Sequence, residues 1–134
     1  PGGSPPEFDA KKAAGIIQYD IDLCIKKLKI QEDSSKVAVA EIIDDYNLKI
    51  ANLLVTHSGS LDYLDAEFDR NIQIAMRNRD PSKMNGTKAE IRRIIPPIKQ
   101  ETLAYENALN AALNEILDDK QRKKWSRYQR QVQN

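Results

Sequence analysis

Glycine, aromatic residues and cysteine are all scarce in this chain: its 134 residues include five Gly, 6% aromatics and a single Cys. The low glycine and aromatic content disfavours a β-sandwich or barrel, and 31% charged with 40% hydrophobic residues favours long amphipathic helices. Cys24 excludes an intrachain disulfide, and its place on an apolar stripe favours a packed side chain over a reactive thiol. We therefore expect an all-α protein the size of one domain.

Long hydrophobic runs are absent as well. No stretch approaches the roughly 18 apolar residues of a membrane span, so we expect no membrane insertion, and no signal peptide is visible. The opening "PGGSPPEF" is predicted to be a flexible leader over residues 1–8, followed by a single domain over residues 9–134.

The sequence also lacks the motifs of common enzyme classes: Ser-His-Asp order, P-loop, dinucleotide glycine pattern, CxxC and HExxH. We expect no enzymatic activity and no cofactor. His57 is the only histidine and lies on an apolar stripe; a packed role is favoured over metal ligation, because only Cys24 offers a second soft ligand. Asp62, Asp65 and Asp69 share one helical face and are interpreted as a solvated face, so no metal site is predicted.

The net charge of +1 gives no argument for wholesale binding to nucleic acid or anionic lipid. Basic residues nevertheless crowd the C-terminal end. The segment "RKKWSRYQR" has the residue types to contact phosphates and stack on bases, but helical spacing puts Trp125 and Tyr128 on one side and most cations on the other. We interpret it as an ordinary amphipathic helix and expect no nucleic-acid partner.

Apolar residues at helical spacing predict four helices. The first is expected over residues 10–29, with Asp9 as N-cap. The second is expected over residues 35–79; because its stripe keeps phase past Gly59, residues 36–78 are predicted to be essentially one helix.

The third helix is predicted to begin at a capping box formed by Thr87 and Glu90. It crosses Pro96 and Pro97, which remove two N–H donors and are expected to kink it.

The stretch "LDDKQ", residues 117–121, is predicted to start the last helix. Asp118 is the expected N-cap, Gln121 closes a capping box, and Leu117 just outside is a hydrophobic anchor. The stretch also resembles the LTxxQ motif, which gives its name to a family of small extracytoplasmic bacterial helical proteins. Asp118 stands in place of the motif's Thr. A second, degenerate copy would fall at residues 30–34, "IQEDS", after the first helix.

The order of the predicted elements over most of residues 9–131 is similar to that family too. The resemblance implies an elongated, curved four-helix protein, usually a homodimer that forms a cradle, in the periplasm or secreted. It implies ATP-independent binding of unfolded or partly folded client proteins, as a chaperone or envelope-stress factor, on a concave face of apolar and basic residues. The candidate client-binding residues are Arg92, Arg93, Arg122 and Arg127. The alternative is a structural or adaptor helical bundle whose long helix docks one defined protein partner.

Overall fold

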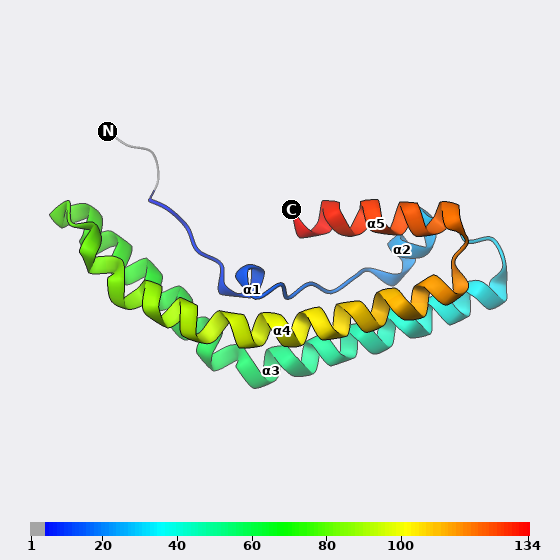
Figure 1. Ribbon diagram of the computed structural model, residues 1–134, viewed down its shortest axis with the longest axis horizontal. Coiled ribbons are helices and arrows are strands. Elements are labelled where there is room, and N and C mark those ends of the chain that lie inside the picture. The colour runs from blue at the N-terminus through cyan, green and yellow to red at the C-terminus, as the bar shows by residue number, and fades with distance from the viewer. Residues whose placement is uncertain (1–4) are drawn as a thin grey trace. The chain divides into compact units, whose positions relative to one another are not determined.

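The computed structural model describes residues 5–134, and every regular element in that range is helical. In chain order (Figure 1) the elements are α1 (Ala10–Ala13), α2 (Ile21–Leu28), α3 (Asp33–Asn78), the 3-10 turn η1 (Pro81–Met84), α4 (Asn85–Ile116) and α5 (Asp119–Gln133). The prediction of an all-α fold with one long central helix is confirmed. Residues 1–4 of the predicted leader lie outside the described range.

Helix α3 runs without a break through Gly59, as the in-phase apolar stripe predicts. A Cβ added at Gly59 would meet nothing within 4 Å, so no close packing requires glycine there. The helix tolerates it because one glycine costs only about 1 kcal/mol relative to alanine, which the buried stripe offsets. That stripe includes the fully buried side chains of Val39, Ile43, Ile50, Leu61 and Leu64.

The predicted first helix over residues 10–29 is wrong, because the chain forms α1 and α2 with an extended segment between them. Gly15 has a φ of 73°, in the left-handed region that glycine adopts without strain. Its N–H donates to the carbonyl of Lys12, and the N–H of Ile16 donates to that of Lys11, both at 3.0 Å. This pattern is a helix C-cap, and it ends α1.

The segment before α2 gains its own hydrogen bonds from α3. The backbone N–H of Tyr19 donates to the side chain of Asn47 at 2.9 Å, and the Asn47 amide donates back to the Tyr19 carbonyl at 2.7 Å. Asp20 then caps α2 by accepting the N–H of Leu23 at 3.0 Å. The Asn47 side chain, distant in sequence, therefore forms the hydrogen bonds that Tyr19 would have formed within a continuous helix.

The predicted capping box at Thr87 and Glu90 is also wrong. Helix α4 begins two residues earlier, at Asn85, directly after η1. The Thr87 hydroxyl is buried and accepts a hydrogen bond from the Asn71 side chain at 2.7 Å. Pro96 and Pro97 both lie inside α4, as predicted.

Contacts between Cα atoms divide the chain into two compact units. Within the described range, unit 1 contains residues 5–16 and Leu54–Glu101, and unit 2 contains Ile17–Leu53 and Thr102–Asn134. In each unit a segment of α3 lies beside a segment of α4 (Figure 1). The single domain expected over residues 9–134 stays a prediction.

Candidate functional site

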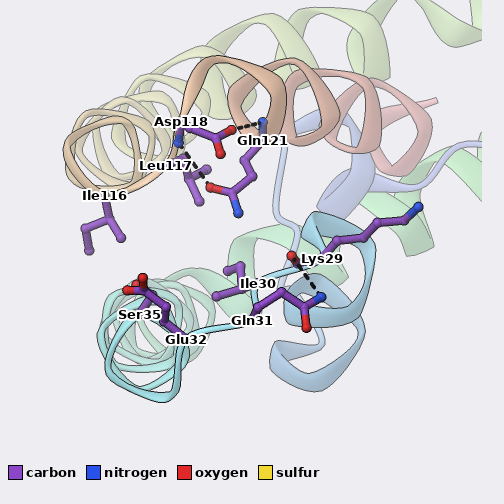
Figure 2. Close-up of a pocket in the computed structure, with 9 residues that line it drawn as sticks. All are labelled: Lys29, Ile30, Gln31, Glu32, Ser35, Ile116, Leu117, Asp118 and Gln121. Carbon is purple, nitrogen blue, oxygen red and sulfur yellow. Dashed lines mark hydrogen bonds between the residues drawn. The ribbon is translucent and has the colours of Figure 1, made fainter.

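The two stretches compared with the LTxxQ motif meet in unit 2, where they line one pocket of about 400 Å³. We call it the motif pocket; Figure 2 shows its residues. Ile30 and Leu117, the first residues of the two stretches, are both buried. The remaining lining residues are Lys29, Gln31, Glu32, Ser35, Ile116, Asp118 and Gln121.

The reciprocal cap predicted at the start of α5 is present (Figure 2). The backbone N–H of Gln121 donates to Asp118 Oδ1 at 2.8 Å, and the Asp118 N–H donates to Gln121 Oε1 at 3.0 Å. These two bonds satisfy two of the N–H groups that a helix N-terminus leaves unpaired. The motif residues Asp118 and Gln121 therefore stabilise the N-terminus of α5 in unit 2.

The earlier stretch has different bonds. The Gln31 side chain makes one long hydrogen bond, 3.5 Å, to the carbonyl of Lys29. The backbone carbonyl of Glu32 accepts the N–H of Lys36 at 3.0 Å and so starts the α3 ladder. The absence of Thr and Gln at the motif positions accounts for this difference, because their side chains would supply the cap.

Trp125 anchors α5 in the core of unit 2. Its side chain is 2% exposed, and its indole N–H donates to Asn110 Oδ1 at 2.8 Å. Its ring centroid lies 5.1 Å from that of Tyr19 and 6.1 Å from that of Tyr128, distances at which aromatic pairs attract. Burial raises the pKa of Tyr19 and also that of Tyr46, whose hydroxyl donates to the carbonyl of Ile17 at 2.8 Å.

Cys24, His57 and Asp65 were considered as possible ligands or nucleophiles. In the structure each of them is buried or contacts another residue of the fold. Cys24 is fully buried in unit 2, and burial together with the nearby Asp20 charge raises its thiol pKa to about 12. In unit 1, His57 Nε2 lies 3.4 Å from Glu101 Oε2. Asp65 Oδ1 accepts the backbone N–H of Ala10 at 2.8 Å, which ties α1 to α3.

Unit 1 contains an apolar pocket of about 510 Å³ at the turn between α3 and α4. Its apolar lining consists of Pro6, Phe68, Ile72, Ala75, Met76, Pro81 and Met84. Arg79, Asp80 and Lys88 add charge at the same pocket. Met76 is 46% exposed, whereas Met84 is buried, so one methionine faces solvent and the other forms part of the wall.

The sequence patterns did not predict this apolar pocket. The missing information is tertiary: Met84 and Lys88 lie beyond the turn and reach the pocket only because α4 folds back along α3 within unit 1. The two methionines of the chain both line the pocket, a signal that composition alone does not reveal.

The four arginines predicted to bind clients are divided between the units. In unit 1, Arg92 lies one helical turn beyond Lys88 and is exposed, whereas Arg93 forms an ion pair with Glu90. In unit 2, Arg122 is held by α4 and Asp119, and Arg127 lines a basic pocket at α5. The structure therefore leaves Arg92 and Arg127 as the two without an ion-pair partner in the described range.

The fold and these pockets define an all-α protein with an open apolar site in unit 1 and a basic surface on α5. Comparisons with protein-family models, curated proteins and solved structures give no match to this chain. The LTxxQ resemblance therefore stays a hypothesis. Among the described helices, none is both long and apolar enough to cross a membrane.

Proposed function

We propose that this protein is an extracytoplasmic, ATP-independent chaperone-like or envelope-stress protein that binds unfolded or partly folded client proteins. The observation that carries the proposal is the apolar pocket of unit 1, which combines an exposed methionine with neighbouring cations. Clients in this proposal contribute exposed apolar side chains, and no catalytic group is needed.

The chemistry of the pocket suits promiscuous binding. Methionine is unbranched and polarizable, so Met76 and Met84 adapt to side chains of different shape. Burying apolar client surface supplies most of the binding free energy, at about 25 cal/mol per Å². Lys88 and the exposed Arg92 provide positive charge that speeds the encounter with acidic client segments.

A symmetric homodimer and a periplasmic or secreted location complete this proposal. Both are implied by the LTxxQ resemblance. Val37 and Leu48 support the dimer, since they lie eleven residues, or three helical turns, apart on α3 and are 58% and 60% exposed. Exposed apolar side chains aligned on one helix face are typical of protein contact surfaces.

The same aligned side chains also favour the alternative function, an adaptor whose long helix docks one defined partner. The two functions differ in specificity. A chaperone slows aggregation of several unrelated proteins, whereas an adaptor binds one partner and protects none.

Light scattering during aggregation of several unrelated, chemically denatured clients, without ATP, separates these functions. We expect the wild-type protein to suppress aggregation of most of them. Met76→Gln keeps the side-chain length but adds a polar amide, so it should suppress less well. Leu103→Gln is the matched control, because Leu103 is 46% exposed, like Met76, and does not line the pocket. If no client is protected by the wild type, the chaperone proposal is wrong.

A further inference from the structure

A second pocket, in unit 2, is lined almost entirely by hydrogen-bond donors. It lies between the last turns of α4 and one side of α5 and has a volume of about 450 Å³. We call it the basic pocket; its lining residues are Asn114, Arg122, Lys123, Ser126, Arg127 and Arg130. Four of the six are cations and none carries a carboxylate, a composition suited to an anionic ligand.

Arg122 is already occupied by the fold. Its Nε and Nη2 atoms donate to the carbonyl of Asn114 at 3.1 and 2.6 Å, and its Nη1 donates to Asp119 at 2.8 Å. The Asn114 carbonyl is in the last turn of α4, where no later helical N–H reaches it, so Arg122 caps that helix. Among residues 5–134, by contrast, no carboxylate pairs with Lys123, Arg127 or Arg130.

The three unpaired cations set the size of the ligand. Lys123 and Arg130 are seven residues apart on α5, which is about 10 Å along the helix axis. Cations spread over that length can give each of two phosphate groups its own partner, whereas a single phosphate would use only part of the row. The guanidinium groups of Arg127 and Arg130 are suited to bidentate pairing with phosphate oxygens, and the Ser126 hydroxyl adds a neutral donor.

The surroundings of the basic pocket raise the local positive potential. Helix α5 carries six basic residues and one acidic residue, Asp119, which Arg122 already neutralises. On another side of α5 the pKa of Lys124 is lowered, first by desolvation and then by the charges of Lys29 and Lys120. An anion in the basic pocket therefore relieves repulsion among Lys123, Arg127 and Arg130 in addition to forming direct bonds.

We propose that the basic pocket binds a ligand that carries two phosphate groups, joined directly or through a short linker. A free pyrophosphate and a lipid headgroup with two phosphates share this chemistry. A nucleic acid fits less well, because both aromatic side chains between these cations already pack within unit 2: Trp125 is buried, and the Tyr128 ring lies against those of Tyr19 and Trp125. This inference does not depend on the proposed chaperone function.

The test is titration calorimetry of the full chain with pyrophosphate, alongside co-sedimentation with phosphatidylcholine vesicles with and without cardiolipin, whose headgroup carries two phosphates. Arg127→Gln with Arg130→Gln should weaken binding by more than about tenfold, since each charge-assisted bond contributes about 1.5 kcal/mol or more. Lys120→Gln with Lys124→Gln removes the same charge from α5 outside the pocket and should weaken binding less than about twofold. Circular dichroism checks that both variants keep the wild-type helix content.

Each result of these binding measurements either supports or contradicts the proposed phosphate site. Binding of pyrophosphate alone, or of cardiolipin vesicles alone, supports the site and identifies the source of the phosphates. Equal weakening by the two double variants overturns it, because the attraction would then be diffuse. Binding of a glutamate peptide of the same charge as tightly as pyrophosphate overturns the phosphate assignment, and no binding to either phosphate probe overturns the site itself.

Discussion

The two units of this protein are built with different chemistry. Unit 2 buries an aromatic cluster and a satisfied polar network, in which Glu106 accepts from Tyr19 at 3.2 Å, from Gln129 at 3.4 Å and from Gln133. Unit 1 instead leaves an apolar pocket open and Met76 nearly half exposed. Burial in one unit stabilises the fold, whereas incomplete burial in the other keeps apolar surface available for binding. We infer a division in which unit 2 contributes most to the stability of the fold and unit 1 provides the apolar surface for the proposed client binding.

The largest effect should come from Trp125→Ala in unit 2. It removes the buried indole, its contacts with Tyr19 and Tyr128, and the hydrogen bond to Asn110. We expect the free energy of unfolding in urea to fall by about 3–5 kcal/mol, as for other large-to-small core changes.

Two further variants sharpen that comparison. Trp125→Phe keeps an aromatic ring and loses the indole hydrogen bond, so it should cost less than Trp125→Ala. In unit 1, Phe68→Ala should also cost less, because Phe68 is only partly buried. Equal losses for Phe68→Ala and Trp125→Ala would contradict the division between the units.

Removal of the reciprocal cap should have the next largest effect. Asp118→Ala with Gln121→Ala should destabilise α5 by about 1–2 kcal/mol, since each cap contact is typically worth about 1 kcal/mol. Because the cap lies in unit 2, aggregation suppression by the folded variant at low temperature should stay close to the wild-type level. A loss of suppression with unchanged helix content would assign the motif a direct role in client binding.

Alkaline pH should lower the free energy of unfolding of unit 2. The folded-state pKa of Cys24 is raised to about 12 from 9.0, and those of Tyr19 and Tyr46 are raised from 10.0. These groups contribute stability that is fully present below their unfolded pKa values and is lost as pH rises toward the folded ones. We expect a loss of about 1 kcal/mol in the first pH unit above 9, from Cys24 mainly. Urea unfolding with Cys24→Ala as the control should show a smaller loss.

Sequence patterns predicted the features that depend on neighbouring residues. The stripe of α3 and the cap at Asp118 both follow from side chains a few residues apart, and both were found. The break between α1 and α2 depends on Asn47, 28 residues from Tyr19, and the cap expected at Thr87 fails because Asn71 bonds its hydroxyl. The apolar pocket needed the pairing of α3 with α4, which no local pattern encodes.

The smallest effect concerns the two adjacent arginines of unit 1. Arg92→Gln should slow client capture by about twofold to threefold at low salt, since a rim charge acts mainly on the association rate. Arg93→Gln should slow it less, because Glu90 already neutralises much of that charge. Stopped-flow binding of a labelled acidic client, measured at several salt concentrations, tests the order. Equal association rates for the two variants would contradict the proposal that the charge of Arg92 speeds client capture.

The central claim, that unit 1 binds clients through its apolar pocket, can be tested with methyl NMR. The chain has two methionines, and both line that pocket, so a sample labelled only at the methionine methyls reports on the site and on nothing else. Titration with a permanently unfolded client, such as reduced and carboxymethylated α-lactalbumin, should shift or broaden the signal of the exposed Met76 first and that of the buried Met84 less. Unchanged signals from both methionines, in a sample where sedimentation shows the client bound, would contradict the claim.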